Sequence, residues 1–424
     1  MTTFEQRLAV IGKLAAGITE HRTELVRATV EDIGFPAWEA EREIDLTVER
    51  LSLFSRLRPL LAGRVSLARG DEYVAIALPY DGNTWMNTAI VSVWLAGNPV
   101  RVKFAGKNGT IAGITEEMYA PLFGGEVSFD RRSGRNYLES VLADPKARAV
   151  IVFGSDRHVL PYYRAVRQSG KKFIFEGPGN DPFIILEHAD LEAAVADLME
   201  SKYRYSGQTC VAPERILVHE SIYAPFLECF IEKSRRLIVG QPGYGKVDVV
   251  PLASASAARN IGLFLEDARA KGGRMVLGGQ VRGTLVEPAI VAEASEFMWG
   301  MRDELFGPVS FVAAFADQTE AVRLAQANRY GLRASVFGDP KEAEAVATAL
   351  RGADYCREVP EYVFGRFGTV SVNESRSVAW REALITKPIG GYGYSGWIWE
   401  TVGDRFVLKQ GPRLFSLETS VPVE

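Results

Sequence analysis

Apolar residues in the first fifty positions recur at intervals of three and four, which is the spacing of one helix face. In residues 7–34 this spacing predicts a helical segment that stops at Gly34-Phe35-Pro36, because glycine and proline interrupt a helix. A second helix is predicted from about residue 37 to residue 60, and residues 61–79 change to the shorter alternation of β-strands. The chain therefore begins with helices and continues into a sheet.

From residue 89 onward, strand-like and helix-like segments alternate. Strands are predicted at 99–104, 126–129, 147–153 and 171–176, with helices between them. A second series starts near Gly179, where Asp190 is the expected N-cap of a helix, and a third runs from 260 to 337. This alternation predicts an α/β fold with parallel sheets covered on both faces. The tail at 405–424 alternates like a strand, and we expect it to lack a partner in its own chain.

Composition narrows the class of protein. The 424 residues are 47% hydrophobic and 24% charged, as is typical of a soluble globular protein with two or three domains. The net charge of −4 gives no general attraction to nucleic acid or anionic membrane, and the apolar run at 89–97 is too short to span a bilayer. The three cysteines give neither a disulfide framework nor metal-ligand spacing, so we expect a cytoplasmic protein without a metal.

One cysteine, Cys210, follows a predicted glycine turn in the stretch SGQTC at 206–210. Gly207 allows the backbone to turn where a β-carbon would clash. A thiol in this place has two interpretations, a small packing residue or a nucleophile, and a nucleophile needs a nearby base, cation or dipole. The stretch alone leaves both interpretations open.

Glu176 is a candidate base, because it ends a predicted buried strand and precedes a Gly-Pro-Gly turn. Sites in open α/β sheets form at the carboxyl ends of strands, and burial raises the pKa of a carboxyl toward that of a general base. A residue that only caps a turn is the other interpretation. Two further segments have the same two interpretations, a functional site or a plain turn. They are Glu304 before Phe306-Gly307-Pro308 and the glycine-dense loop at 387–396.

Seven segments, in order, resemble motifs of the aldehyde dehydrogenase superfamily. GQTC with the following APER resembles the catalytic-cysteine motif, EGPGNDP the glutamate motif ELGGKSP, and ELFGPV the motif E[IL]FGPV. KPIGGYGYSG is similar to PFGGxxxSG, VFGS to FTGS, AGNPVRVKFA to AGNxVVxKPS, and GTVSVN to GTVWVN. The match spans nearly all of residues 5–420 and identifies the chain as a divergent, amino-terminally short member of the hydrolytic, NAD(P)-dependent type.

The resemblance implies oxidation of a small-molecule aldehyde to a carboxylic acid. Cys210 would form a hemithioacetal and then a thioester, and Glu176 would activate the water that hydrolyses it. Asn373 would help to shape the site. The chemistry of the reaction is consistent with these roles, because it requires a nucleophile, a group that is basic at neutral pH and a cofactor held in a fixed position beside the substrate.

The resemblance also implies a set of cofactor-binding residues. Lys103 and Glu304 would hold the two riboses, and Ser155 would contact the pyrophosphate at the start of a helix. Gly154 and Phe306 belong to the same two turns and would complete the set. Where NAD-specific members of the superfamily carry a glutamate, this chain has Gly106 followed by Lys107, so the cofactor is predicted as NAD or NADP.

Three further departures change what the resemblance implies. The oxyanion-hole asparagine of the superfamily aligns best with Asp81, so we expect Asn83 to take that role after a small loop shift, unless Asp81 is protonated. In the altered turn GPGNDP, Asp181 is expected to raise the pKa of Glu176 by charge repulsion. The segment at 61–71 is short, which favours a homodimer over a tetramer.

The implied architecture has three parts: a Rossmann-type cofactor-binding domain at 1–60 and 72–178, a second α/β catalytic domain at 179–404, and an oligomerisation ribbon at 61–71 and 405–424. Arginines at 357, 366 and 376 are candidates to meet an acidic substrate tail, and aromatic residues such as Trp397 and Trp399 either line a tunnel or simply pack. Two other functions remain open: a CoA-acylating or phosphorylating relative, and a non-catalytic family member that acts as a binding subunit.

Overall fold

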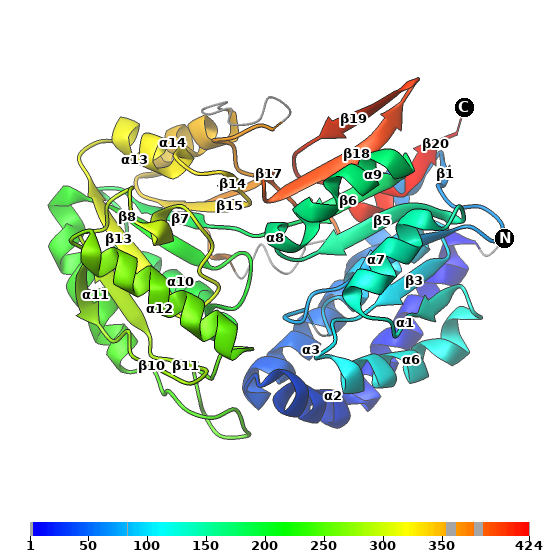
Figure 1. Ribbon diagram of the computed structural model, residues 1–424, viewed down its shortest axis with the longest axis horizontal. Helices are drawn as coiled ribbons and strands as arrows, with labels where there is room; N and C mark the ends of the chain where they lie inside the picture. The colour runs from blue at the N-terminus through cyan, green and yellow to red at the C-terminus, as the bar shows by residue number, and fades with distance from the viewer. Residues whose placement is uncertain (1–2, 83, 353–361, 377–384, 424) are drawn as a thin grey trace. The chain divides into compact units, whose positions relative to one another are not determined.

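The computed structural model describes residues 3–82, 84–352, 362–376 and 385–423. The chain divides into two compact units. Unit 1 holds the described residues up to Glu176, residues 385–389 and the residues from Trp397 onward, and unit 2 holds the remainder from Gly177. The expected α/β class is confirmed, since each unit is built around its own largely parallel sheet (Figure 1).

The amino-terminal part of unit 1 is helical, as the spacing of apolar residues predicted. Thr3 caps the first helix through a reciprocal capping box, and Gly34 ends the helical stretch with a positive φ of 87°. The predicted second helix is shorter than expected, because a 3₁₀ turn at Leu53–Leu57 follows Ser52. The helices are α1 (Phe4–Glu20), α2 (Arg22–Ala28), α3 (Ala37–Ser52) and α4 (Arg58–Leu61).

Unit 1 contains a seven-stranded sheet in the order β19-β18-β6-β5-β2-β3-β4. The strands β6, β5, β2, β3 and β4 run parallel to one another. At the other edge of the sheet, β18 and β19 form an antiparallel hairpin. The strands are β2 (Tyr73–Ala77), β3 (Val100–Lys103), β4 (Val127–Phe129), β5 (Ala147–Phe153), β6 (Lys172–Glu176), β18 (Gly396–Val402) and β19 (Arg405–Lys409). The connecting helices are α5 (Asn87–Leu95), α6 (Gly109–Phe123), α7 (Gly134–Ala143), α8 (Asp156–Val159) and α9 (Tyr163–Ser169).

Unit 2 contains a second seven-stranded sheet in the order β16-β15-β7-β8-β13-β12-β9, parallel except for β9. Its strands are β7 (Asp181–Ile185), β8 (Pro213–His219), β9 (Arg274–Leu277), β12 (Ala289–Ala292), β13 (Val309–Phe315), β15 (Arg333–Phe337) and β16 (Thr369–Val372). Its helices are α10 (Leu191–Tyr203), α11 (Tyr223–Arg235), α12 (Ala255–Ala270), α13 (Gln318–Gln326) and α14 (Pro340–Gly352). Two short ladders complete it: β10 (Val281–Arg282) with β11 (Leu285–Val286), and β14 (Tyr330–Gly331) with β17 (Tyr392–Gly393).

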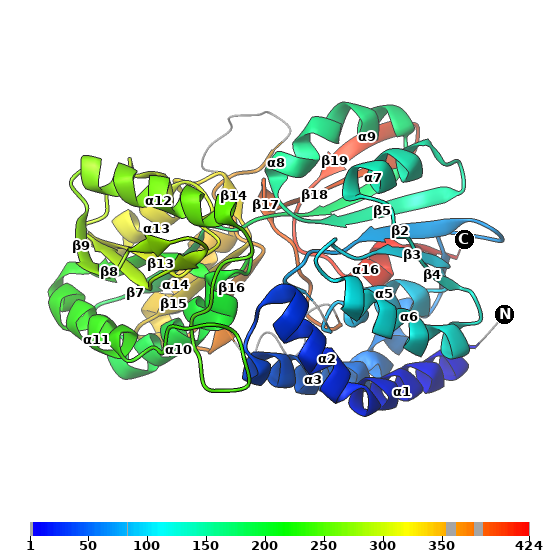
Figure 2. The same cartoon turned by 60° about the horizontal axis from the view of Figure 1, so that its bottom comes forward.

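The core of unit 2 lies on both faces of this sheet. Ile184 belongs to the apolar cluster that α12, α13 and α14 cover, whereas its neighbours Phe183 and Ile185 belong to the cluster that α10 and α11 cover (Figure 2). Successive side chains of a strand point to opposite faces, so the continuous apolar sequence of β7 follows from its burial on both sides.

The carboxyl-terminal tail does find partners in its own chain, contrary to expectation. Strand β19 pairs with β18, and β20 (Ser420–Pro422) pairs antiparallel with β1 (Arg64–Ser66). A short helix, α16 (Phe415–Glu418), connects them. Sequence alternation identified the strands but not their partners, because the register of β1 with β20 depends on residues more than three hundred and fifty positions apart.

Candidate active site

The carboxyl edge of the sheet in unit 1 gathers four of the predicted site residues. Lys103 is the last residue of β3 and lies beside Ala77 of β2, and Glu176 is the last residue of β6 and lies beside Phe153 of β5. Gly154 and Ser155 directly follow β5. Because these strands are adjacent and parallel, their ends meet at one edge, which is where open α/β sheets bind ligands.

The side chains at this edge suit a phosphate- and hydroxyl-bearing ligand. Lys103 is buried, its Nζ donates to the carbonyl of Phe104, and burial lowers its pKa. Ser155 caps α8, where its Oγ accepts a hydrogen bond of 3.3 Å from the N–H of Arg157. Gly154 has a φ of 151°, which places a backbone without a β-carbon at the turn. The ammonium of Lys103, the hydroxyl of Ser155 and the glycine backbone at Gly154 are groups of the kind that bind dinucleotides. The residues present therefore fit NAD or NADP.

Glu176 lies in an environment that raises the pKa of its carboxyl. Only 6% of the residue is exposed, and burial raises the pKa to about 7, against the lowering effect of Arg413 and with a small addition from Glu418. Its backbone carbonyl accepts a hydrogen bond of 3.0 Å from the N–H of Gly154, which ties the base turn to the predicted cofactor turn. A carboxyl with this pKa is half-ionised near neutral pH, as a general base requires.

The predicted oxyanion segment is described only in part. Asn83, the residue expected to supply the amide, lies outside the described residues. Asp81 is buried, and burial together with the nearby carboxylate of Glu43 raises its pKa to about 7. Glu43 of α3 is itself buried and accepts hydrogen bonds from the N–H groups of Thr84 (2.5 Å) and Trp85 (3.0 Å). A neutral Asp81 would be able to donate a hydrogen bond, which an ionised carboxylate cannot do.

In unit 2, three predicted motifs lie at the amino edge of the sheet. The turn with Gly179 and Asn180 precedes β7, Cys210 precedes β8, and Glu304 with Phe306 precedes β13. Strands β7, β8 and β13 are neighbours and parallel, so the three segments are brought together. Asn373 follows the other end of β16, where its amide makes two hydrogen bonds of 2.9 Å to the backbone of Gly338.

Cys210 is half-buried at a turn whose backbone is strained. Tyr205, Ser206 and Gly207 have φ values of 51°, 58° and 74° in succession before the chain reaches the cysteine. Two consecutive non-glycine residues with positive φ are costly, and such strain gathers at functional sites. The Ser206 hydroxyl accepts a hydrogen bond of 2.8 Å from the N–H of Val250, which helps to hold this conformation.

Two glycines allow the motif turns to approach one another. A β-carbon on Gly179 would lie 2.2 Å from the carbonyl oxygen of Cys210, and one on Gly207 would lie 2.3 Å from the carbonyl oxygen of Gly307. No real β-carbon approaches this closely, so both contacts require glycine. The glutamate turn and the ELFGPV turn are thus packed directly against the backbone on both sides of the cysteine.

We predict that Gly207→Ala destabilises the protein by more than about 2 kcal/mol, because it adds a steric clash to a left-handed backbone. Thermal unfolding should show a lower Tm. The matched control is Gly262→Ala in α12, where no atom lies within 4 Å of the added β-carbon. Alanine favours a helix over glycine by about 1 kcal/mol, so the control should melt at or above the wild-type temperature. Equal melting of the two variants would contradict the predicted clash.

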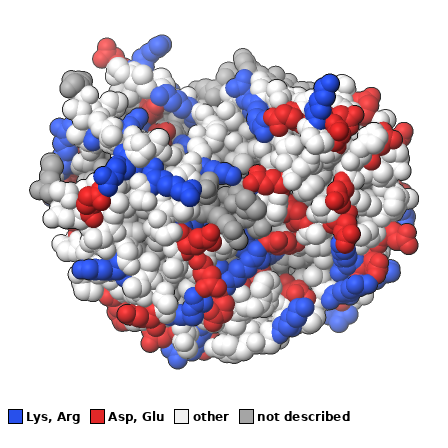
Figure 3. Space-filling view, turned by 180° about the vertical axis from the view of Figure 1, so that it is seen from behind, with Lys and Arg blue, Asp and Glu red and all other residues white. Residues whose placement is uncertain are grey.

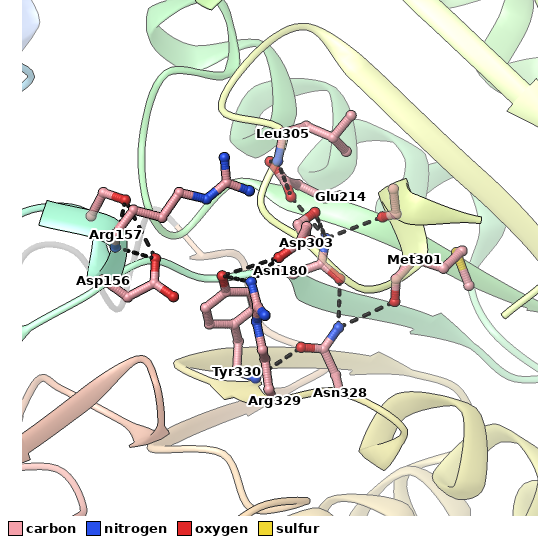
Figure 4. A network of polar contacts seen from close by, with 12 residues as sticks. Asp156, Arg157, Asn180, Glu214, Met301, Asp303, Leu305, Asn328, Arg329 and Tyr330 are labelled. Atoms are coloured by element: carbon pink, nitrogen blue, oxygen red, sulfur yellow. Dashed lines mark hydrogen bonds and ion pairs between the residues drawn. The ribbon is translucent and has the colours of Figure 1, made fainter. Parts of the chain in front are cut away.

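Glu214 connects the predicted motifs of unit 2 and was not predicted from the sequence. It is buried in β8, and its carboxylate accepts hydrogen bonds from the N–H of Leu305 (2.9 Å) and from the Asn180 side chain (2.9 Å) (Figure 4). It also accepts one of 2.8 Å from the N–H of Phe306. Buried Lys202 supplies a nearby positive charge, and burial lowers the lysine pKa to about 8. One carboxylate therefore joins the cysteine, glutamate and ELFGPV motifs. The sequence did contain a sign of this buried carboxylate, namely a Glu-Arg pair at the start of an otherwise apolar strand.

The same network fixes Glu304 and Asn180. The Oε1 of Glu304 accepts a hydrogen bond of 3.2 Å from the N–H of Gly179, and Asn328 donates one of 2.8 Å to the Oδ1 of Asn180. Phe306 has a φ of 55°, a conformation stabilised by the hydrogen bond of its N–H to Glu214. The predicted ribose-binding glutamate is thus held against the turn that precedes β7.

Asp181 and Arg376 form a buried ion pair. Their side chains are 1% and 2% exposed and lie 3.1 Å apart, and Nη1 of Arg376 also donates a hydrogen bond of 2.5 Å to the carbonyl of Val211. Arg376 is therefore engaged beside the cysteine turn rather than exposed to a substrate tail. Arg357 lies outside the described residues, and Arg366 is half-buried.

The described aromatic residues near the predicted opening serve mainly as packing. Trp397 is fully buried against Phe173 and Phe175, with ring centroids 5.4 and 5.2 Å away, and Trp399 lies 5.6 Å from Tyr163. Within the described part of the chain, no cluster of metal-ligating side chains is found and no helix has the length and hydropathy to cross a membrane. Charges of both signs are interspersed on the face shown in Figure 3.

Comparison with known proteins places these motifs in one family. The model of the aldehyde dehydrogenase family matches residues 1–407. A probable NADP-dependent succinate-semialdehyde dehydrogenase of Sinorhizobium fredii is 29% identical over 414 residues, covering 93% of this chain and 80% of that protein. The NADP-dependent succinate-semialdehyde dehydrogenase of Deinococcus radiodurans is 33% identical over 217 residues, covering 50% of this chain and 46% of that protein.

The fold agrees with solved structures. The glyceraldehyde-3-phosphate dehydrogenase of Methanocaldococcus jannaschii, solved as a complex with NADP, matches with a TM-score of 0.82 at 23% identity, covering 99% of this chain and 88% of that one. The comparisons confirm the predicted resemblance, the fold class, and an enzyme that oxidises aldehydes with NAD or NADP. The chain belongs to the aldehyde dehydrogenase family.

Proposed function

We propose that the protein oxidises a short aldehyde carrying a carboxylate, of the succinate-semialdehyde type, to the dicarboxylic acid, with NADP as the preferred cofactor. The observation that carries this proposal is the alignment over 93% of the chain with a protein named as a probable NADP-dependent succinate-semialdehyde dehydrogenase. Gly106 supports the cofactor preference, because an exposed glycine followed by Lys107 leaves no carboxylate there to repel a 2′-phosphate.

Cys210 is the proposed nucleophile. Its thiolate attacks the aldehyde carbon, and the carbonyl π electrons move to oxygen to give a tetrahedral hemithioacetal. The oxyanion electrons then re-form the carbonyl bond as the carbon loses hydride, which the oxidised nicotinamide cofactor would accept. The carbon–sulfur bond is kept, so the product on Cys210 is a thioester. The strained turn at Tyr205–Gly207 and the close contact of Gly179 with the Cys210 backbone support this role, since they hold the sulfur in a fixed place.

Glu176 is the proposed general base for hydrolysis. Its carboxylate takes a proton from water while the water oxygen attacks the thioester carbon, and the sulfur leaves as thiolate. The acid is released, and the proton passes from Glu176 to solvent. A buried carboxyl whose pKa is raised to about 7 is half in the basic form at neutral pH and is basic enough to accept that proton.

The bound cofactor would supply the hydride acceptor. Lys103, Gly154 and Ser155 at the carboxyl edge of one sheet would hold its adenosine ribose and pyrophosphate, and Glu304 with Phe306 would hold the nicotinamide-side ribose. Asn83 is proposed to donate to the oxyanion of the hemithioacetal. The raised pKa of buried Asp81, about 7, supports a side chain that is neutral in about half of the molecules near pH 7, which reduces the repulsion that an ionised carboxylate would cause.

Purified protein should reduce NADP faster than NAD with succinate semialdehyde, in the absence of CoA. The assay follows reduced cofactor with a panel of neutral, cationic and carboxylated aldehydes of similar length, each with both cofactors. A carboxylated aldehyde should give a kcat/KM at least about tenfold above its neutral counterpart, because an ion pair or charge-assisted hydrogen bond contributes on the order of 1.5–3 kcal/mol. Strict dependence on CoA or phosphate would establish the acylating alternative, and no turnover with any aldehyde would favour the binding-subunit alternative.

We further propose a cytoplasmic homodimer with cofactor-binding, catalytic and oligomerisation parts, in which β18 and β19 belong to the cofactor-binding part because they extend the sheet of unit 1. The odd number of cysteines supports a reducing compartment. The β1–β20 ribbon supports the dimer, because Val65 on β1 and Val423 directly after β20 are exposed apolar residues.

A further inference from the structure

Arg413 lies beside Glu176 at the carboxyl edge of the unit 1 sheet. Its Nε is 3.8 Å from Oε1 of Glu176, and the two side chains are 3% and 5% exposed. The residue follows β19 and is fixed by two backbone hydrogen bonds to Ile389, of 3.0 and 2.7 Å. Its Nε also donates a hydrogen bond of 3.0 Å to the carbonyl of Gly411. These hydrogen bonds fix the backbone of Arg413 in a position from which its guanidinium reaches Glu176.

The remaining polar atoms of this pair are unsatisfied. Nη1 and Nη2 of Arg413 and Oε1 of Glu176 are buried, and among the described residues none of the three has a hydrogen-bond partner. A buried guanidinium without an anion is strongly unfavourable, and so is a buried carboxylate without a cation. The guanidinium therefore favours the ionised form of Glu176, although the 3.8 Å contact is an ion pair rather than a short hydrogen bond.

Other charged groups surround the pair on the neighbouring elements. Glu418 of α16 opposes the ionisation of Glu176. Lys172, on the same strand as Glu176, lies 2.8 Å from both Glu418 and Glu400, so part of the negative charge of Glu418 is already balanced. Arg413 is the cation that pairs directly with Glu176 in this set.

We propose that Arg413 is a positioning residue that holds the Glu176 carboxylate in its ionised form for thioester hydrolysis. The proposal rests on the function proposed for Glu176. Burial pushes the carboxyl toward its neutral form, which cannot take a proton from water, and the guanidinium pulls it back toward the anion.

The test is the pH profile of thioester hydrolysis in Arg413→Met and Arg413→Lys. Loss of the charge should raise the pKa of Glu176 by about one unit, since an opposite charge at this range shifts a carboxyl by about 1–3 units. The rise of the hydrolysis rate with pH should therefore move about one unit higher in Arg413→Met. The rate should drop about fivefold near pH 7, where a base of pKa about 7 is half ionised and one of pKa about 8 is about one-tenth ionised. Arg413→Lys keeps the charge and should restore most of the wild-type profile.

Single-turnover kinetics gives the readout, with the acyl-enzyme followed by intact mass at each pH. A purely structural role would lower the rate at every pH without moving the profile, and that result in Arg413→Met would overturn the proposal. Arg413→Gln, a neutral hydrogen-bond donor, is measured in the same way where the methionine variant does not fold. Failure of the function proposed for Glu176 is recognised separately, because Glu176→Gln would then hydrolyse the thioester at the wild-type rate.

Discussion

Replacing Cys210 with alanine should reduce aldehyde oxidation by at least about 10⁴-fold, because removal of a catalytic nucleophile leaves only binding and electrostatic contributions. The loss should appear in kcat, since no hemithioacetal can form without the sulfur. The substitution removes one atom from a half-buried side chain, and the neighbouring turn is held by its own backbone contacts. The Tm should therefore stay within a few degrees of wild type, and cofactor binding, measured by fluorescence titration, should persist.

The matched control is Cys229→Ser, which changes the other described cysteine, on α11 of the same unit. This variant should keep wild-type kcat/KM. Alkylation with iodoacetamide adds a second comparison, since it should inactivate the wild-type protein and label Cys210 by peptide mass. Wild-type turnover in Cys210→Ala, or inactivation that follows the labelling of Cys229, would reject the proposed nucleophile.

Strands were the most predictable part of the fold, because their signal is local. The predicted strands at 147–153 and 171–176 correspond to β5 and β6 within one residue. Both are apolar because both sheet faces are covered, and that pattern is unambiguous over five to seven residues. Helix ends were less certain, as the early stop of α3 at Ser52 illustrates. A helical spacing persists through a 3₁₀ turn, so the sequence pattern did not mark the change.

Site residues were predictable where they belong to a recognised motif and not where they depend on distant contacts. Cys210, Glu176 and Glu304 were selected in this way and stay predictions; the close packing around Gly179 and Gly207 explains why the turns beside Cys210 require glycine. The ion pair of Asp181 with Arg376 joins positions far apart in the sequence, and a charge in a sequence does not name its partner. The same holds for Arg413 beside Glu176 and for Glu214 beneath the ELFGPV turn.

Glu176→Gln should stall the enzyme at the thioester. Loss of a general base typically slows the step that needs it by about 10²–10⁴-fold, whereas formation of the thioester requires only the thiolate and the cofactor. The first turnover should therefore give a burst of reduced cofactor equal to the enzyme concentration, followed by a slow phase. Intact mass should show the acyl group on the protein, and Cys210→Ala should show none.

The pH dependence separates this role from a structural one. In the wild type, the hydrolysis rate should rise through about pH 7 and level off above it, because the ionised form of Glu176 is the base and its pKa is raised to about 7. The glutamine variant has no group to titrate there, so its slow phase should not follow that curve.

The matched control for this substitution is Glu304→Gln, the same chemical change in a carboxylate proposed to bind the cofactor ribose. Glu304→Gln should raise the KM for the cofactor without accumulating acyl-enzyme, because it weakens binding and leaves the hydrolytic base intact. A burst in both variants would mean that any loss of a site carboxylate slows hydrolysis, and Glu176 would lose its assignment as the base. A burst in Glu176→Gln alone assigns the hydrolytic proton transfer to the one carboxyl that is buried at the end of β6.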